Sequence, residues 1–186
     1  MTADTAPCFA VFDAPIGPCG IAWTEQAIVA FTLPERTAEK TAARLRRRWP
    51  AAVQASPPAW VTATIDKVLR LLHGDKVDLS DVPLDLATSP GFHRRVYEVA
   101  RAIPPGHTMT YGEIAKRLGV PHESREVGQA LGRNPIAVIV PCHRVLGADG
   151  KMGGFSATGG VATKRRILEI EGAAALGAGP LFESLK

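Results

Sequence analysis

The chain has 186 residues and a formal net charge of +4 at pH 7, with 46% hydrophobic, 22% charged and 6% aromatic residues. This composition is typical of a globular protein with one ordinary core or two small ones, and it excludes an intrinsically disordered chain. No stretch approaches the ~20 apolar residues that span a bilayer, and the N-terminus lacks the features of a secretion signal. We therefore expect a cytoplasmic protein. The Ala/Gly-rich run over residues 172–180 predicts a loose C-terminal segment.

Cysteine usage and charge distribution narrow the function further. The three cysteines, Cys8, Cys19 and Cys142, are an odd number in a chain with no secretion signal, so we expect free thiols. Residues 1–85 hold 9 Lys and Arg against 10 Asp and Glu, whereas residues 86–186 hold 13 against 8. The basic excess of the second half favours a phosphate-rich partner such as nucleic acid, although a modest excess is also common on solvated surfaces.

The first part of the chain predicts a small sheet followed by a helix. Residues 9–33 alternate short β-rich runs with Pro and Gly, which is typical of a hairpin or meander. A helix is predicted over residues 37–48, ended by Pro50. Its Arg46-Arg47-Arg48 cluster could touch phosphate, but cations in a last helical turn also favour the helix dipole, and this plainer interpretation is preferred.

A second helix and a domain boundary follow. Apolar residues at helical spacing predict a helix over residues 60–73, and residues 78–86 predict a short strand or a loop. We place the boundary after this segment, which divides the chain into domains 1–85 and 86–186.

Three helices are predicted at the start of the second domain. The first covers residues 89–103 and opens on a Ser-Pro pair that predicts its N-cap. Two short helices follow over residues 111–118 and 124–132, with Thr110 and Ser124 as their caps. Two helices joined by a short turn in a basic region suggest a helix-turn-helix, whose second helix meets DNA, although helical hairpins that bind no DNA are more numerous.

A buried strand is predicted over residues 135–140, because this run is continuous, apolar and rich in β-branched residues. Cys142 follows the end of that strand. A lone cysteine in such a place is more often an inert thiol, but the neighbours of Cys142 change that expectation. His143 can take a proton, and Arg144 raises the positive potential that favours thiolate, the nucleophilic form.

A proton path and an orienting acid complete the expected site. Since neighbouring side chains point in different directions, a bridging water would carry the proton between Cys142 and His143. Glu171, at the end of a helix predicted over residues 161–171, is the acid expected to hold the imidazole in its useful tautomer. Without further information, Glu171 would be interpreted as a solvated helix residue.

The run Asn134-Pro135 to Pro141-Cys142-His143-Arg144-Val145 closely resembles the active-site signature of the O6-alkylguanine-DNA alkyltransferase family, also called methylated-DNA-protein-cysteine methyltransferases. The likeness covers roughly residues 85–172, through Phe92, Thr110-Tyr111, Arg125-Glu126-Val127-Gly128, Gly159-Gly160 and Lys164 to Glu171-Gly172. It implies an α/β (α+β) fold. A variable, ribonuclease-H-like N-terminal domain of β-sheet and helices would precede a mostly helical C-terminal domain with a winged helix-turn-helix.

The resemblance implies DNA repair by direct reversal of damage. Members bind duplex DNA, flip out the damaged nucleotide and move its alkyl group onto a cysteine, which matches Cys142. The implied substrates are O6-alkylguanine and also O4-alkylthymine in double-stranded DNA. Because a thioether has no acyl carbonyl for water to attack, each molecule acts once and needs no cofactor. We expect a monomer with no obligatory protein partner and no membrane contact.

The resemblance also implies catalytic roles for five residues. Cys142, a water, His143 and Glu171 match the relay that generates the thiolate. Asn134 matches the asparagine that braces the turn around the active site. Tyr111 matches the tyrosine that assists base rotation and hydrogen-bonds to the guanine ring.

Further residues match the family's substrate and DNA contacts. Arg125 matches the arginine finger that fills the space left by the flipped base, and Val145 matches the residue whose carbonyl reads the guanine amine. The hydroxyl that contacts O6 is either Thr158, by counting back from the glycine pair, or Ser156, by its aromatic-serine context. This loop also sets the tolerance for larger adducts. The remaining DNA contacts are expected from Tyr111, Gly112, Val127 and Gly128.

No metal is predicted, although some relatives carry a structural zinc in the first domain, because Cys8 and Cys19 lack suitably spaced histidines. Three other functions stay open. A lesion-binding module without transfer is disfavoured by Cys142, since such relatives have tryptophan there. A Cys-His-Glu hydrolase would turn over esters or peptides and would not need a helix-turn-helix. A transcription regulator would leave the spacing around Cys142 unexplained.

Overall fold

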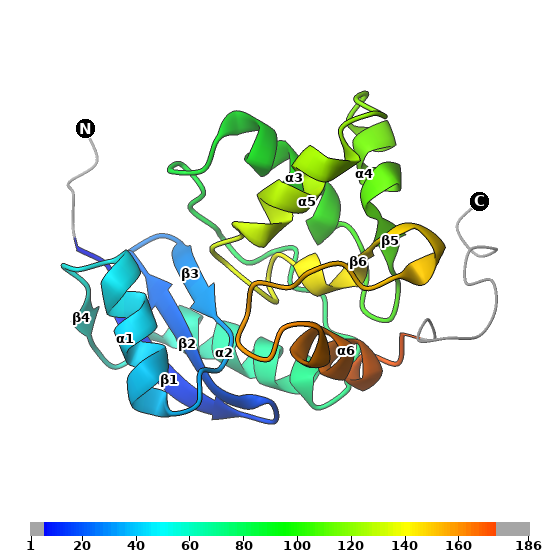
Figure 1. The fold of residues 1–186 in the computed structure, drawn as a ribbon. Coiled ribbons are helices and arrows are strands. Elements are labelled where there is room, and N and C mark those ends of the chain that lie inside the picture. The colour runs from blue at the N-terminus through cyan, green and yellow to red at the C-terminus, as the bar shows by residue number, and fades with distance from the viewer. Residues whose placement is uncertain (1–5, 174–186) are drawn as a thin grey trace.

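The structure is a computed structural model that describes residues 6–173, so most of the segment predicted to be loose lies outside the described residues. The fold is a mixed α/β arrangement, with a sheet and two helices at one side and a group of short helices at the other (Figure 1). No helix among residues 6–173 is long and apolar enough to cross a membrane.

The first part of the chain forms a four-stranded sheet in the order β3-β2-β1-β4. Only β1 and β4 pair in parallel, while the other neighbours are antiparallel. Ala14 pairs with Gly17, whose positive φ of 117° suits a tight turn and would strain any residue with a Cβ. The hairpin predicted from residues 9–33 is confirmed. The strands are β1 (Cys8–Ala14), β2 (Gly17–Trp23), β3 (Ile28–Thr32) and β4 (Val53–Gln54).

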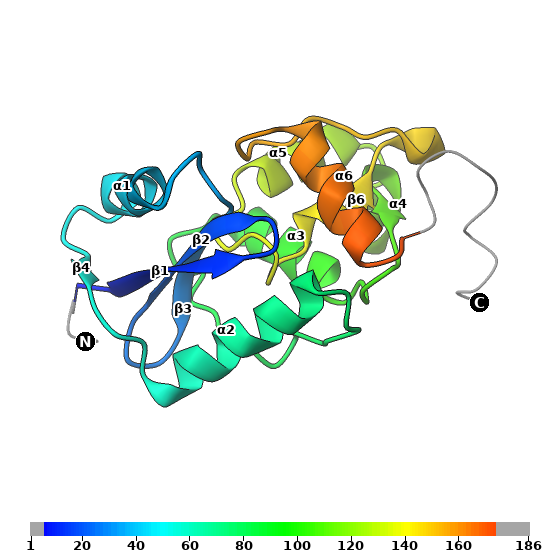
Figure 2. The same ribbon diagram turned by 90° about the horizontal axis from the view of Figure 1, so that it is seen from below.

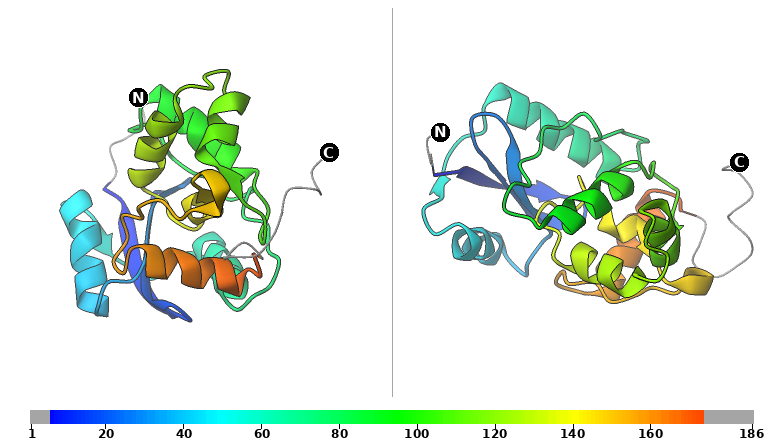
Figure 3. Two further views of the ribbon diagram at one scale, coloured as in Figure 1. Left: turned by 45° about the vertical axis from the view of Figure 1, so that its right-hand side comes forward. Right: turned by 90° about the horizontal axis from the view of Figure 1, so that it is seen from above.

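Two helices cover the sheet, α1 (Ala38–Arg48) and α2 (Ala59–Leu72), and both confirm predicted helices. Figure 2 and the right-hand view of Figure 3 show them on opposite faces of the sheet. The side chain of Thr37 caps α1 by accepting a hydrogen bond from the Lys40 amide. Residues 78–86 form a loop that touches β3 through one bridge.

The second half is mostly helical, as predicted. Helices α3 and α5 pack against each other, as do α4 and α5, and a short parallel pair of strands, β5 and β6, lies beside them (Figure 1). The bounds are α3 (Gly91–Arg101), β5 (Met109–Thr110), α4 (Tyr111–Arg117), α5 (Ser124–Gly132), β6 (Val145–Leu146) and α6 (Val161–Ile170).

Helix caps were predicted with mixed success. Thr110 caps α4 in a full capping box: its hydroxyl accepts from the Glu113 amide at 3.1 Å, and the Glu113 carboxylate accepts from the Thr110 amide at 2.6 Å. The Ser124 cap was wrong, because Ser124 is already the first residue of α5. The Ser-Pro cap of α3 was also wrong. Pro90 itself precedes the helix, and its fixed φ of −54° starts the turn without a side-chain bond.

The strand predicted over residues 135–140 is wrong, because the chain turns back on itself there. Val138 has a positive φ of 68°, and the Val140 amide donates to the Ile136 carbonyl at 2.9 Å. The segment pairs with β3 through Phe31, whose amide donates to the Pro135 carbonyl at 3.0 Å and whose carbonyl accepts from the Ala137 amide at 3.2 Å. The apolar run correctly indicated burial, but a buried turn and a buried strand have the same composition.

One hydrophobic core joins the two halves of the chain. Its buried members include Ile21 and Phe31 from the sheet and Val96, Ile114 and Ile167 from the helices. The turn that precedes Cys142 therefore rests on the sheet on one side and on the helices on the other.

Candidate active site

Cys142 begins η1 (Cys142–Arg144), a single 3-10 turn that follows the buried turn over residues 135–140, and only 8% of Cys142 is exposed. Asn134 holds the buried turn together from within. Its Nδ2 donates to the Val140 carbonyl at 2.8 Å, and its Oδ1 accepts from the Ile136 amide at 3.0 Å. The predicted brace is therefore made of two hydrogen bonds that fix the approach of the chain to the cysteine.

Behind the cysteine lies a buried ionic cluster of His143, Arg144 and Glu171. His143 Nε2 lies 2.8 Å from Glu171 Oε1, and because a carboxylate can only accept, the imidazole donates from Nε2. Arg144 donates to both oxygens of Glu171, through Nε at 2.9 Å and Nη2 at 2.8 Å. Its Nη1 donates to the Ile103 carbonyl at 2.6 Å. The structure thus brings together His143 and Glu171, as predicted, and adds Arg144 as a third member.

This cluster sets the protonation states of its members. Burial alone would raise the pKa of Glu171, but the charges and hydrogen bonds of His143 and Arg144 outweigh it, and the pKa is lowered well below its usual range. Burial lowers the pKa of His143 despite the nearby Glu171 carboxylate. The imidazole is therefore neutral at pH 7 and can accept a proton, as a general base must.

The positive charge next to Cys142 is that of Lys164, a residue to which the sequence assigned no role. Burial raises the pKa of the Cys142 thiol, and the hydrogen bond from Asn134 and the charge of Lys164 oppose that rise. Arg144 was expected to favour the thiolate, but its guanidinium is bound by Glu171 instead. Lys164 is 1% exposed, and burial lowers its pKa to about 8. The sequence did hold a signal that Lys164 is buried: it lies three and four residues before Ile167 and Leu168, both of which are buried on the same face of α6.

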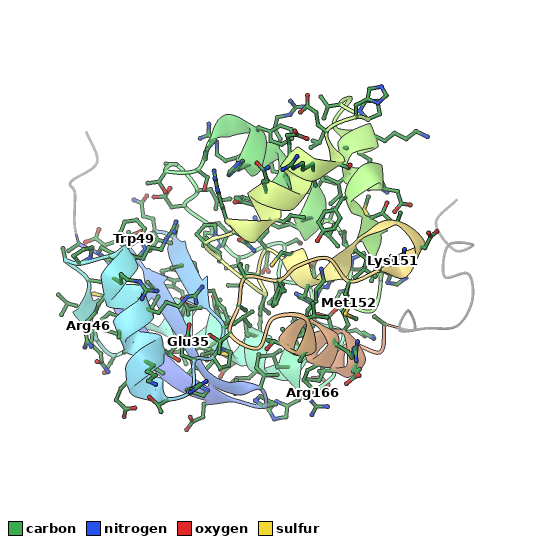
Figure 4. The ribbon with its side chains drawn as sticks, viewed as in Figure 1. Glu35, Arg46, Trp49, Lys151, Met152 and Arg166 are labelled. Carbon is green, nitrogen blue, oxygen red and sulfur yellow. The ribbon has the colours of Figure 1, made fainter. Side chains whose placement is uncertain are left out.

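Cys142 opens into a cavity of about 370 Å³ between the two halves of the molecule. Asn134, Ala137 and Ser156 line it, together with residues of α1. Thr158, the other candidate for the O6 contact, does not line this cavity, and its hydroxyl donates to the carboxylate of Glu35. Figure 4 shows Glu35 between α1 and the segment that leads into α6.

The predicted DNA contacts gather around a second groove, beside α4 and α5. Its lining includes Tyr111, Gly112, Arg125 and Gly128. A Cβ at Gly153 would lie 2.8 Å from the Tyr111 hydroxyl, so this glycine allows the loop to pack on the ring. Val127, the remaining predicted DNA contact near this groove, does not line it, because the whole residue is buried in the core.

The Val145 carbonyl, expected to read the guanine amine, accepts a hydrogen bond from Lys164 Nζ at 2.5 Å, and Val145 is fully buried. Cys19 is a different kind of thiol, since burial raises its pKa to about 12. Among residues 6–173, no group of three or more His, Cys, Asp or Glu side chains could hold a metal ion.

The second half of the chain matches a known family. Residues 91–173 match the family model described as "6-O-methylguanine DNA methyltransferase, DNA binding domain". A methylated-DNA-protein-cysteine methyltransferase of Mycobacterium tuberculosis is 37% identical over 163 residues, covering 88% of this chain and 91% of the relative. The methylated-DNA-protein-cysteine methyltransferase of Methanothermobacter thermautotrophicus is 34% identical over 158 residues, covering 85% of this chain and 81% of the relative.

Solved structures agree with this match. The crystal structure of the Mycobacterium tuberculosis O6-methylguanine methyltransferase superposes with a TM-score of 0.73 at 37% identity, over 93% of this chain and 96% of that one. The Mycobacterium tuberculosis OGT in complex with DNA gives a TM-score of 0.68 at 33% identity, over 90% and 94%.

The fold and the site, a cysteine backed by a buried His-Glu pair beside two short helices, define a DNA-binding transferase of the DNA-repair class. The chain belongs to the family of methylated-DNA-protein-cysteine methyltransferases.

Proposed function

We propose that this protein repairs duplex DNA by moving the alkyl group of O6-alkylguanine, and also of O4-alkylthymine, onto Cys142. The observation that carries the proposal is the position of Cys142: it lines a cavity, and the next residue, His143, is paired with Glu171. A nucleophile and a base held in this way are the minimum that thiolate transfer requires. The DNA-binding family model and the DNA complex of a similar protein support DNA as the partner, and we propose that this DNA is double-stranded.

The chemistry begins with removal of the thiol proton. His143 Nε2 is occupied by Glu171, and Nδ1 is buried with no hydrogen-bond partner among residues 6–173. Nδ1 is therefore the nitrogen that accepts the proton of Cys142, through a bridging water. The sulfur then bonds to the alkyl carbon while the bond from that carbon to O6 breaks. The electron pair stays on the base, where Tyr111 assists protonation, and the thioether is permanent, so each molecule acts once without a cofactor.

The groove beside α5 supports base flipping as the route by which the lesion reaches Cys142. Arg125 is exposed in the first turn of α5, where it can enter the stack that the flipped nucleotide leaves. Tyr111 lies on the same groove and would hold the rotated base, with Gly112 and Gly128 allowing close approach of the DNA backbone.

Finer features of the architecture belong to the same proposal. The sheet with α1 and α2 on its two faces supports a ribonuclease-H-like N-terminal domain over residues 1–85. Helices α4 and α5 with the β5-β6 pair support a winged helix-turn-helix within residues 86–186. We further propose a cytoplasmic monomer that acts without an obligatory protein partner.

The deciding experiment uses a duplex oligonucleotide that contains one O6-methylguanine. After incubation, the Cys142 peptide should carry the mass of one added methyl group, and the methylated base should be restored to guanine. Cys142→Ala should bind the same duplex but form no adduct, whereas Cys8→Ala, which changes a half-buried cysteine far along the chain, should form it. Binding without an adduct on the wild-type protein would indicate a lesion-binding module, and repeated turnover on esters would indicate a hydrolase.

A further inference from the structure

The cavity that opens on Cys142 has a strongly basic wall. Arg44, Arg47 and Arg48 of α1 all line it, and no Asp or Glu of the described chain does. The wall therefore comes from the N-terminal half, whereas the cysteine comes from the C-terminal half. A cationic surface of this kind in a partly enclosed cavity attracts anions more strongly than the same charges on open surface.

One of the three arginines is held by an ion pair with another described residue, and the other two are not. Arg44 donates to Glu35 Oε1 at 2.7 Å, and the Thr158 hydroxyl occupies Oε2 of the same carboxylate. Arg47 and Arg48 are exposed and form no ion pair with any residue from 6 to 173. Both oxygens of the nearby carboxylate are thus already engaged, which leaves the Arg47 and Arg48 guanidiniums available to a ligand.

Their neighbour Arg46 provides a contrast on the same helix. Its guanidinium lies 4.9 Å from the centroid of the Phe9 ring, and its Nη2 donates to Gln54 at 3.1 Å. Figure 4 shows Arg46 on the outer side of α1, away from α6. Arg46 therefore packs on the sheet and does not line the cavity, whereas Arg47 and Arg48 do.

We propose that Arg47 and Arg48 bind an anionic group at the far end of the alkyl adduct, so that the protein accepts carboxyl-bearing alkyl groups such as carboxymethyl. This inference rests on the proposed function. The sulfur must reach the first carbon of the adduct, so the remainder of the adduct extends into the cavity that the arginines line. The small side chain of Ala137 leaves room there, and guanidinium groups bind carboxylates through paired hydrogen bonds.

The transfer itself needs no additional reactant. The Cys142 thiolate bonds to the methylene carbon of O6-carboxymethylguanine, and the bond from that carbon to O6 breaks with its electron pair left on the base. The base takes one proton and becomes guanine. The product is S-carboxymethylcysteine, whose carboxylate remains next to the arginines.

The test compares two adducts of one shape and different charge in the same duplex, O6-carboxymethylguanine and O6-carbamoylmethylguanine. Single-turnover rates of adduct formation on Cys142 are measured for the wild type, Arg47→Gln, Arg48→Gln and the double variant. Because the acid and the amide differ in intrinsic reactivity, the quantity compared is the ratio of wild-type to variant rate for each adduct. Arg46→Gln is the matched control, because it removes the same charge from the same helix but does not line the cavity.

We expect the double variant to slow carboxymethyl transfer at least about fivefold more than carbamoylmethyl transfer, which is the effect of one favourable ion pair. Arg46→Gln should affect the two adducts equally. Equal slowing of both adducts by the double variant, with a weaker dependence on salt, would mean that the arginines bind a DNA phosphate and would overturn the proposal, as would no slowing at all. Wild-type transfer from O6-methylguanine is measured in parallel, so that its failure is recognised as failure of the proposed function.

Discussion

His143 donates from Nε2 to a carboxylate oxygen of Glu171 at 2.8 Å, and neither side chain is more than 1% exposed. The carboxylate fixes the tautomer of the imidazole and leaves Nδ1 free to take a proton. It also binds Arg144, which keeps that guanidinium away from the thiol. The remaining cation beside Cys142 is Lys164, whose charge opposes the rise in the pKa of the thiol caused by burial.

Glu171→Gln should slow methyl transfer by about 100-fold or more, because the amide no longer stabilises the imidazolium that forms when His143 accepts a proton. It should also lower the free energy of unfolding by several kcal/mol, since Arg144 stays buried without its partner. Single-turnover kinetics and urea unfolding measure the two effects. Glu169→Gln changes an exposed residue of α6 and is the control. Wild-type kinetics in a folded Glu171→Gln protein would contradict the role of Glu171.

The free energy of unfolding should fall as the pH is lowered from about 7 to about 4. The pKa of folded His143 lies below its usual 6.5, so below pH 6.5 the unfolded chain binds a proton that the folded chain does not. The pKa of Glu171 lies far below its usual 4.5, so the same argument applies below pH 4.5.

Each of these two groups can contribute up to about 1.4 kcal/mol per pH unit. Urea unfolding at several pH values measures the slope. His143→Gln should flatten its upper part, between about pH 4.5 and pH 6.5, and a stability that stays constant or rises on acidification would contradict the assignment.

Asn134→Ala should destabilise the protein by about 1–3 kcal/mol for each buried group that it leaves unpaired, the Val140 carbonyl and the Ile136 amide. It should also slow transfer, because the pKa of Cys142 rises when the hydrogen bond from Asn134 is lost. Asn134→Asp keeps the acceptor but not the donor and adds a negative charge. It should recover part of the stability and none of the rate. An unchanged unfolding midpoint in Asn134→Ala would refute the bracing role.

Ser156→Ala should slow transfer from O6-methylguanine about tenfold, because Ser156 lines the cavity with Cys142 and can donate to the departing oxygen. Thr158→Ala should slow it less, since the Thr158 hydroxyl is bound to Glu35. Single-turnover rates of the two variants decide between the two hydroxyls. A larger effect of Thr158→Ala would reverse the assignment.

Arg125→Ala should reduce the transfer rate from duplex DNA about tenfold or more and from single-stranded DNA much less, because the finger is needed only where a base leaves a stack. The comparison of the two substrates measures this. Arg165→Ala, which removes an exposed arginine from α6, is the matched control. Equal transfer rates of the wild type and Arg125→Ala on duplex DNA would contradict the proposal that Arg125 fills the space left by the flipped base.

Local sequence patterns predicted most helices and the Thr110 cap of α4. They failed where one pattern of residues is compatible with two different backbone structures. The Thr110 cap depends on an amide only three positions further along the chain, so Thr110 could be predicted as a cap from the sequence. The apolar run over residues 135–140 indicated burial, but its turn depends on Asn134 and on the positive φ of Val138. The apolar run itself has no periodicity that would distinguish a buried turn from a buried strand.

The sequence by itself determined the mixed helix and strand content, the nucleophile and, by its resemblance to a family, the residues that serve it. Only the tertiary structure decided that Glu171 holds both His143 and Arg144, that Lys164 is the buried cation, and that Arg47 and Arg48 face the same cavity as Cys142. The physical reason is distance along the chain. Helices and caps form between near neighbours, whereas burial and pairing of charges depend on elements that meet only when the core is packed.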